Sequence, residues 1–590
     1  MGAKASRNAM NRVGMSARSL ARALVVPALA LAVASASHRD ARAQTISPSQ
    51  VTPRDLRPAA SPAGGVELPA AAGLTAPPGA DKLPLSLGRV GIEGGFDELA
   101  GAGAAATNAL TGGPVTVADV YRVANELERA YAAAGYVLAR VVVPPQKLEK
   151  GGALRLVVVD GFIESVDVSR LPASQRAWIA ARMAPLVGLR HVTLGEIERR
   201  LLLASDDPGL RLRSTLVAGG VTGAARLVLE GTYDPVTGSI GVDNHLPASL
   251  GVYSLNASVA INGVLGFGEQ IYATGSSGWR VGEIGGPNAP LELFGGGVSL
   301  PLGTDGFVVN PEYTRSVSRP FPTAGSPASV GYFDRFDLRA SYPIARTRAQ
   351  SLVVQGALEW DEEYLSPIGF GTDLYRDNYG VARLQADEAL QLPWAAAAEA
   401  IGAVSQGLGG RDGADATASA IPLSRQGASA DFTKADLTLR YTQALPEAFQ
   451  LALIARGQSS FGKPLFISEA FSLDGPDAVS GFASGTFSVD EGALARVELG
   501  RALAIPAGPA LATIAPYVFA AGGRGFIDDA TAAQQAAIEA TSFGLGARTG
   551  VDLAGQPFGT SLTLEAARFQ SNVAGERAGW RGNVSFQIRF

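Results

Sequence analysis

The chain ends with WRGNVSFQIRF at positions 580–590, and this stretch decides the fold class. In an extended strand, successive side chains point to opposite faces. One face would therefore carry Trp580, Val584, Phe586, Ile588 and Phe590, and the other Arg581, Asn583, Ser585, Gln587 and Arg589. An apolar stripe opposite a polar one suits a transmembrane barrel strand, which lies between lipid and a wet lumen. At the edge of a soluble sheet, the same apolar face would promote aggregation.

Alternation of the same kind recurs upstream. It is present in VQGALEW (354–360), ADLTLRY (435–441) and ARVEL (495–499). Such runs, separated by Gly, Pro and Asp, fill the chain from residue 233 onward, where helical periodicity nearly disappears. A soluble sandwich also alternates, but it carries more charge on its outer faces. We therefore expect a mainly β chain in which residues 233–590 form a transmembrane antiparallel β-barrel of about 16 strands.

The composition narrows the class of function. The 590 residues include 72 glycines, 35 prolines and only 17% charged residues, which is unlike an ordinary soluble enzyme. The lack of cysteine excludes a disulfide framework, thiol catalysis and cysteine-bound metal. The apolar run 505–523 contains three prolines, so it cannot form a spanning helix. If the chain enters a membrane there, strands must cross it.

The first 43 residues are predicted to be a secretory signal peptide. Basic residues at positions 4–22 precede an apolar stretch, and Ala41-Arg42-Ala43 places cleavage after residue 43, with a second possible site after Ala36. A short helical anchor is the alternative, which Pro27 disfavours. Removal takes seven basic residues and one acid from a chain of net charge −5, so the mature chain is too acidic to favour nucleic acid.

Residues 44–83 are rich in Pro, Ala, Gly and Ser and are predicted to be a linker. Two α+β modules are predicted after it, at 84–160 and 161–232. The first contains a strand at 90–92, a helix from the Thr116 cap to Gly135, and strands at 136–143 and 153–160. The second contains a strand at 163–168, a helix at 174–186, a helix that begins with the Thr193–Glu196 capping box, and strands at 210–216 and 225–229.

Several motifs resemble those of the two-partner secretion outer-membrane transporters, the TpsB class of ShlB/FhaC/HecB-like haemolysin secretion/activation proteins. Tyr131, Gly135-Tyr136 and Pro144-Pro-Gln146 match the first POTRA module of that family. Glu196-Ile-Glu198-Arg199 and Pro208-Gly209 match the second module, and Gly241-Val-Asp243-Asn244 matches the first barrel strand. The resemblance covers residues 84–590.

This resemblance implies a non-enzymatic pore in the outer membrane of a Gram-negative bacterium, with its POTRA modules in the periplasm and no cofactor. Its partner would be a large, unfolded secreted polypeptide of the TpsA type. Outer-membrane lipid and, during biogenesis, the barrel assembly machinery would be further partners. We expect the polypeptide to add a strand to a module edge formed by Val137, Leu138, Ala139, Arg140, Val141 and Val142.

The stretch FSLDGPDAVSGFASGTFSVDEG (471–492) resembles a large loop of the family that folds back into the barrel lumen. By this resemblance its tip is formed by Val479, Ser480, Gly481 and Phe482, and the barrel wall that faces it contributes Phe519, Ala521 and Gly523. The family has Arg at the position of Ser480 and Asp at that of Ala521. We therefore expect this chain to lack the ion pair between loop and wall. Loss of both partners costs far less than loss of one.

Other functions remain as alternatives. His191 precedes a helix cap and His245 has no second histidine near it in sequence, so we predict no metal site and no catalytic residues. A barrel-protein insertase of the same superfamily is one alternative, although such proteins usually carry more than two modules. A passive porin would need no modules. The enzyme alternative is a lipid-hydrolysing barrel that uses His245.

Overall fold

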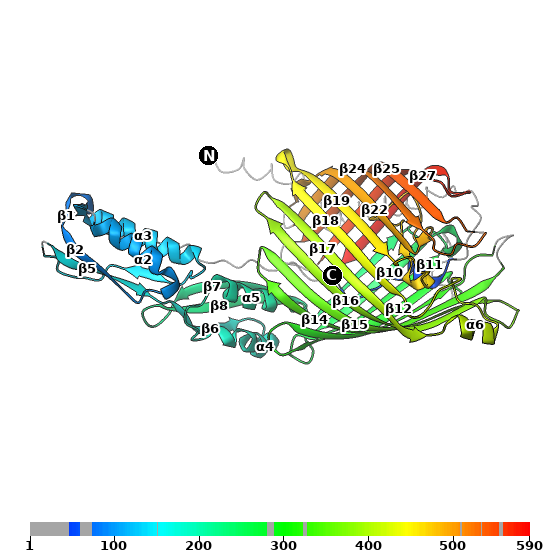
Figure 1. The fold of residues 1–590 in the computed structure, drawn as a ribbon, viewed down its shortest axis with the longest axis horizontal. Coiled ribbons are helices and arrows are strands. Elements are labelled where there is room, and N and C mark those ends of the chain that lie inside the picture. Colours follow the sequence, from blue (N-terminus) through cyan, green and yellow to red (C-terminus); the bar gives the residue numbers. More distant parts are fainter. Residues whose placement is uncertain are drawn as a thin grey trace, which may run out of the picture.

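The computed structural model describes residues 46–58, 74–111, 113–149, 151–279, 288–322, 327–507, 510–532, 534–553 and 558–590. Two small α+β modules and a large β-barrel follow one another along the long axis of the molecule (Figure 1). The predicted mainly β fold class is confirmed. The predicted signal peptide, residues 1–43, lies outside the described residues. Among the helices that are described, none has the length and apolar character needed to span a membrane.

The first module contains β1 (Pro84–Leu85), β2 (Leu87–Glu93), α2 (Ala100–Thr111), β3 (Val115–Thr116), α3 (Val117–Ala133), β4 (Arg140–Val142) and β5 (Gly152–Val159). Its three-stranded sheet has the order β2-β5-β4. The Thr116 hydroxyl caps α3 by accepting a hydrogen bond from the Asp119 amide, as its sequence predicts. Helix α2 was not predicted. Its sequence consists mostly of small residues, and since only Ala106 and Leu110 are buried, it shows little apolar periodicity.

The second module contains β6 (Phe162–Arg170), α4 (Ala173–Met183), α5 (Leu194–Ser205), β7 (Leu210–Ala218) and β8 (Ala224–Tyr233). Its sheet has the order β6-β8-β7, so the two modules repeat one pattern, with a parallel pair beside an antiparallel pair. The Thr193–Glu196 capping box is present at the start of α5. Ile179, Met183, Ile197 and Leu201 fill the core between the helices and the sheet.

The barrel strands are β9 (Val236–Asp243), β10 (Tyr253–Asn262), β11 (Gln270–Trp279), β12 (Leu291–Leu302), β13 (Phe307–Ser318), β14 (Ser329–Arg346), β15 (Gln350–Pro367), β16 (Tyr375–Leu392), β17 (Ala396–Gly410), β18 (Thr433–Ala444), β19 (Phe449–Ser459), β22 (Glu491–Arg501), β23 (Leu503–Ala507), β24 (Ala510–Phe526), β25 (Ala537–Leu553), β26 (Gly559–Ser571) and β27 (Ala578–Arg589). All neighbours pair antiparallel in one closed sheet. Because β22 and β23 both pair with β24, they form one interrupted strand, and the barrel has sixteen strands.

The C-terminal strand β27 closes the barrel against β9. This seam has five residue pairs, whereas β14 and β15 share seventeen. Backbone hydrogen bonds between Gly238 and Phe590 extend the seam at its module-side end. Trp580 is 67% exposed on the outer wall, whereas Asn583 is buried in the lumen. Trp580 and Asn583 thus lie on the lipid-facing side and the lumenal side, as the sequence pattern predicts.

The second module contacts the barrel turns that face it. Arg199 and Arg200 of α5 lie 3.4 and 3.3 Å from Asp305 in the turn between β12 and β13. On the same side, Trp178 donates a hydrogen bond of 2.9 Å to Asp207, and burial raises the pKa of Asp207 to about 7. Trp178 and Asp207 both belong to the module, so it is the ion pairs of Arg199 and Arg200 that join it to this mouth of the barrel.

Gly209 lies where the module joins the barrel, and a test follows from its surroundings. Its φ is +76°, and an added Cβ would lie 2.3 Å from the Asp234 carbonyl oxygen and 2.8 Å from Nδ2 of Asn262. We expect Gly209→Ala to cost more than the roughly 1–2 kcal/mol of left-handed strain alone, and to speed hydrogen exchange in β7, β8 and β10.

Gly188→Ala is the matched control for this test. Gly188 has a φ of +77° and nothing within 4 Å of an added Cβ, so this change introduces strain without a clash. Equal hydrogen exchange in the two variants would contradict the proposed role of Gly209 at the joint.

Candidate functional site in the barrel lumen

The lumenal loop, residues 471–490, lies between β19 and β22. Its two ends pair as β20 (Phe471–Ser472) and β21 (Ser488–Val489), and residues 491–492 already belong to β22. The Asp474 carboxylate accepts hydrogen bonds from the amides of Gly485 at 2.8 Å and Phe487 at 2.6 Å. The loop therefore has an internal structure of its own, held by a buried carboxylate.

The tip of the lumenal loop packs against the inner wall. Val479 is fully buried, and the Phe482 ring lies 4.6 Å, centroid to centroid, from the ring of Phe569 on β26. At Gly481 an added Cβ would lie 2.4 Å from Cβ of Phe569, so this glycine allows the backbone to approach the wall. Val479 and Phe482 of the predicted tip thus lie together in one apolar cluster.

Ser480 meets a charged pair that lies within the wall, while the loop tip itself supplies no charge to it. Its hydroxyl donates to Oε1 of Glu565 on β26 and accepts from Nη1 of Arg496 on β22 at 2.8 Å. Arg496 and Glu565 lie 2.6 Å apart. Asn583 of β27 donates to the Ser480 carbonyl at 2.8 Å. The ion pair therefore exists within the wall, and the loop inserts a neutral hydroxyl between its members.

The predicted wall residues surround this pair without supplying its charges. Ala521 is the register partner of Arg496 across β22 and β24. The guanidinium carbon of Arg496 lies 3.9 Å from the ring centroid of Phe519. At Gly523 an added Cβ would lie 3.1 Å from the Leu473 side chain, so this glycine leaves room for the loop. Glu565, the carboxylate that pairs with Arg496, lies two strands away from Ala521.

Sequence reasoning did not identify Arg496 and Glu565. The run ARVEL showed that Arg496 and Glu498 share a face, and these two side chains do bond at 2.7 Å. That face was not assigned to the lumen. Glu565 lies in a strand for which no pairing could be derived, because register between distant strands is not encoded in local periodicity.

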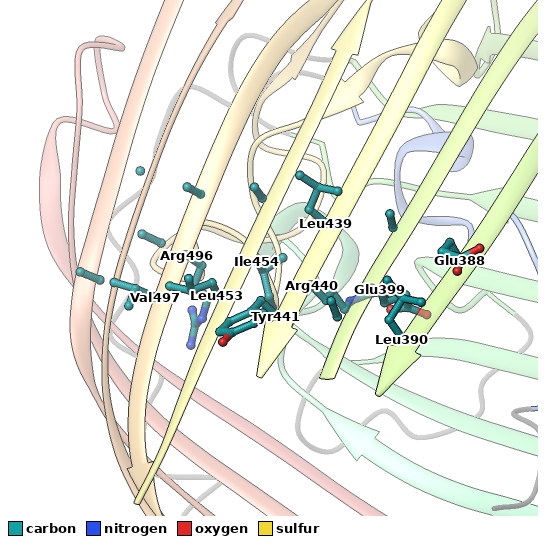
Figure 2. A pocket seen from close by; sticks show the side chains of 17 residues that line it. Glu388, Leu390, Glu399, Leu439, Arg440, Tyr441, Leu453, Ile454, Arg496 and Val497 are labelled. Atoms are coloured by element: carbon teal, nitrogen blue, oxygen red, sulfur yellow. Dashed lines mark hydrogen bonds and ion pairs between the residues drawn. The ribbon is translucent and has the colours of Figure 1, made fainter. Parts of the chain in front are cut away.

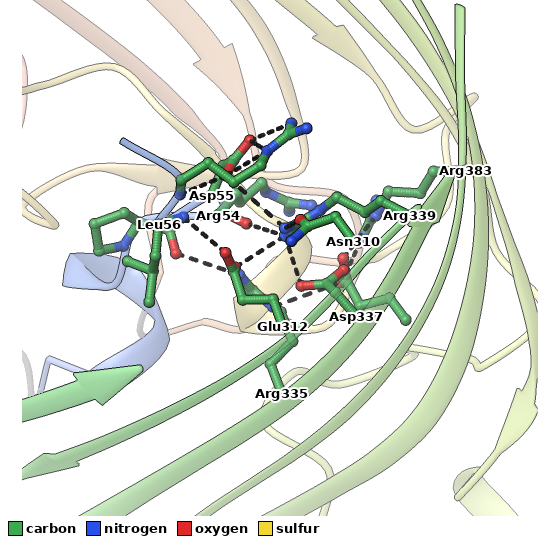
Figure 3. Close-up of polar contacts among 12 residues, drawn as sticks. Arg54, Asp55, Leu56, Asn310, Glu312, Arg335, Asp337, Arg339 and Arg383 are labelled. Carbon is green, nitrogen blue, oxygen red and sulfur yellow. Dashed lines mark hydrogen bonds and ion pairs between the residues drawn. The ribbon is translucent and has the colours of Figure 1, made fainter. Parts of the chain in front are cut away.

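A second chain segment also fills the lumen. Residues 46–58, here called the N-terminal segment, contain a short 3-10 helix, η1 (Pro48–Val51), and lie against the inner wall (Figure 3). Ser49 donates to Glu363 at 2.7 Å, and Arg339 donates to the Arg54 carbonyl at 2.8 Å. The prediction of a linker at 44–83 is therefore wrong for residues 46–58. These residues form no apolar core of their own, but polar side chains of the barrel wall hold them in place.

Glu469 connects the two lumenal segments. It is fully buried, and its carboxylate lies 3.1 Å from Arg54 of the N-terminal segment and 2.9 Å from Lys434 of β18. Arg383 of β16 also pairs with it. We call Arg54, Arg383, Lys434 and Glu469 the Glu469 cluster. The three carboxylates of Glu359, Asp361 and Glu469 are close enough to hold a cation, yet they are already neutralised by arginines and a lysine.

The predicted edge strand of the first module differs from the structure. Only Arg140–Val142 forms a strand, because Gly135 has a φ of +99° and residues 136–139 form a turn. Val137 and Leu138 pack against the core of the second module. The Val141 amide, which edge pairing would need, donates instead to Glu128 at 3.0 Å. Strand addition at 137–142 would have to displace these contacts.

Two other features do not compete with the lumen as the candidate site. A hollow of about 690 Å³ follows the wall from β16 to β24 (Figure 2), and two of its lining charges, Arg440 and Glu399, pair with each other at 2.8 Å. His245 lies 3.5 Å from Asp243, and its carbonyl accepts a hydrogen bond from the Ser484 amide of the lumenal loop. His245 therefore has a structural contact with the lumenal loop.

Comparison with known proteins identifies the family. The model of the haemolysin secretion/activation protein ShlB/FhaC/HecB matches residues 225–549, which is more than half of the chain. This chain belongs to the ShlB/FhaC/HecB family. The model of the ShlB-type POTRA domain matches residues 95–161, which contain most of the first module. The sequence-based resemblance is confirmed, and the protein is an outer-membrane barrel with its POTRA modules on the periplasmic side.

Individual relatives support this assignment. The chain is 25% identical over 434 residues to the hemolysin transporter protein ShlB of Serratia marcescens, covering 71% of this chain and 73% of that protein. It is 25% identical over 162 residues to the heme/hemopexin transporter protein HuxB of Haemophilus influenzae, covering 27% of this chain and only 28% of HuxB. The solved structure of CdiB from Escherichia coli has a TM-score of 0.66 at 18% identity, and covers 96% of this chain and 98% of that one, which shows the shared fold.

The wall ion pair gives a test of how the lumenal loop is held. Glu565→Ala leaves the buried Arg496 with Glu498 as its remaining carboxylate partner and takes away the acceptor of the Ser480 hydroxyl. It should therefore cost more than Ser480→Ala, which removes two hydrogen bonds worth about 1 kcal/mol each. We expect the first change to expose residues 471–490 to protease and to lower the temperature of barrel unfolding in a heat-modifiability gel.

Asp552→Ala is the control for loss of an ion pair. It breaks an exposed pair with Arg589 at 3.3 Å, which is worth less than about 1 kcal/mol. If Glu565→Ala behaves like Asp552→Ala in protease sensitivity and unfolding, the wall pair does not hold the loop.

Proposed function

We propose that this protein exports a large, unfolded partner polypeptide across the outer membrane by two-partner secretion. The observation that carries the proposal is a barrel whose lumen is filled by two chain segments, each held by polar contacts to the wall. A passive porin needs an open lumen. A lumen that is filled by movable segments suits a pore that opens for one particular cargo.

The polar contacts make displacement feasible. Arg54 and Glu469 are stabilised by each other in the lumen, where the Glu469 carboxylate is fully buried, but water can solvate both when the segments leave. A cargo chain that enters from the periplasm brings water and backbone polar groups with it. The exchange of one set of polar partners for another needs no hydrolysed nucleotide, and folding of the cargo outside the cell would make the export directional.

The POTRA modules are the proposed binding site for the cargo. They lie at the periplasmic mouth, where α5 contacts the barrel turns. Because the β4 edge of the first module is engaged by Glu128, strand addition is favoured at the opposite edge of the sheet, β2. Assembly of the barrel itself would depend on the barrel assembly machinery.

Deletion of residues 84–232 tests the role of the modules. We expect a barrel that still inserts, shown by heat-modifiability, but that no longer retains the partner polypeptide in a pull-down. Deletion of residues 46–58 is the control, since it changes the lumen and leaves the modules intact. Binding that survives the loss of residues 84–232 would contradict cargo recognition by the modules.

Removal of Arg54 tests the closed state of the pore. Arg54→Ala leaves Glu469 with two of its three cationic partners, so we expect the N-terminal segment to dissociate more often and the pore to open more often in planar bilayers. Arg122→Ala, on the solvent face of α3, removes an exposed guanidinium without touching the lumen. If both variants show the same opening frequency as the unmodified protein, Arg54 does not keep the pore closed.

A further inference from the structure

The outer wall near its extracellular end carries an arginine between two exposed aromatic side chains. Phe543 on β25, Arg568 on β26 and Trp580 on β27 are neighbours in register across the three strands. Phe543 is 56% exposed and Trp580 is 67% exposed. The guanidinium carbon of Arg568 lies 5.8 Å from the Trp580 ring centroid. We call these three residues the Arg568 row.

Arg568 has no carboxylate partner among the described residues. Three other arginines on the outer wall have carboxylate partners: Arg315 with Asp334 at 3.5 Å, Arg376 with Glu362 at 3.1 Å, and Arg524 with Glu539 at 3.4 Å. An arginine on a lipid-facing wall costs about 2–4 kcal/mol at the bilayer midplane and about 0–1 kcal/mol near the interface. Arg568 is therefore expected to lie at the membrane–water interface or to bind an anion that is not part of the chain.

The strand geometry places Arg568 at the outer interface. Nine residues of β26, from Gly559 to Ala567, separate it from the end of the strand that faces the POTRA modules. A tilted strand of about 9–11 residues crosses the hydrocarbon layer. The guanidinium is therefore level with the headgroups of the outer leaflet, where phosphate groups of glycolipids are abundant.

The neighbouring rows complete a site for a lipid. Toward the cell exterior, the next row pairs Thr541 with Gln570, whose polar side chains are exposed. Toward the membrane centre, the row below contains Ala566 and Gly582 as register partners. They lie beside Leu545, which is 63% exposed, so the wall in this row is apolar and carries little side-chain bulk on β26 and β27. From the cell exterior toward the membrane centre, the first row of side chains is thus polar, the second is cationic and aromatic, and the third is apolar.

We propose that the Arg568 row binds a phosphorylated glycolipid of the outer leaflet. The guanidinium would take a phosphate, the Trp580 ring would stack on a sugar, and an acyl chain would lie over Ala566 and Gly582. Arginine suits this role because its planar fork binds phosphate through two hydrogen bonds. The site lies on β27, the strand that closes the short seam with β9, so bound lipid would support the weakest pairing of the barrel.

Native mass spectrometry of the full-length protein tests the proposal with three probes: hexa-acylated diphosphoryl lipid A, the same lipid without phosphates, and phosphatidylglycerol. We expect the diphosphoryl lipid to remain bound. Arg568→Ala should reduce its retention by about fivefold or more, as expected for loss of a charge-assisted contact. The dephosphorylated lipid and phosphatidylglycerol should be retained less by the unmodified protein.

Arg315→Ala is the matched control. Arg315 also lies on the outer wall, 5.8 Å from the centroid of the Tyr332 ring, but it is paired with Asp334. It should leave retention unchanged, and heat-modifiability should show that both variants are folded barrels. Equal retention by Arg568→Ala and the unmodified protein, equal losses in the two variants, or equal binding of phosphatidylglycerol would each overturn the proposal.

Discussion

The carboxylate of Glu469 has no contact with water, so cations of the protein must neutralise it. Those cations come from three places in the chain: Arg54 from the N-terminal segment, and Arg383 and Lys434 from the wall. Glu469 itself lies two residues before the start of the lumenal loop. Neutralisation of the Glu469 carboxylate therefore holds both lumenal segments to the barrel wall. A buried charge cannot lose its partners without a large cost, so the segments are held together until water enters.

The tip of the lumenal loop is held by hydrogen bonds to the wall and not by an ion pair of its own. Arg496 and Glu565 neutralise each other on the wall, and Ser480 adds only a hydroxyl between them. When the loop leaves, the wall keeps its own pair, and no charge is left without a partner. Departure of the tip is therefore less costly than departure of Arg54 from Glu469. The chain places the stronger restraint at the base of the loop and the weaker one at its tip.

The barrel and the modules were accessible from sequence because local patterns encode them. The faces of residues 580–590 and the caps at Thr116 and Thr193 follow from short-range rules, whereas the tip around Gly481 was predicted only from the family resemblance. The charged partners of Ser480 were not accessible, since Arg496 and Glu565 come together only through the register of strands far apart in the chain. The N-terminal segment was missed for a related reason. Its Pro-rich sequence has no periodicity, and its contacts are supplied by the wall.

A disulfide between the two lumenal segments tests the central claim, which is that both must leave the lumen for export. The chain has no cysteine, and a Cβ at Gly485 would lie 3.3 Å from Cβ of Gln50, close to the separation of about 3.5–4.5 Å found in disulfides. Secretion of the partner polypeptide should stop in the oxidised Gln50→Cys, Gly485→Cys double variant, return after reduction, and continue in both single variants. Secretion at the unmodified rate with the disulfide intact would contradict the account.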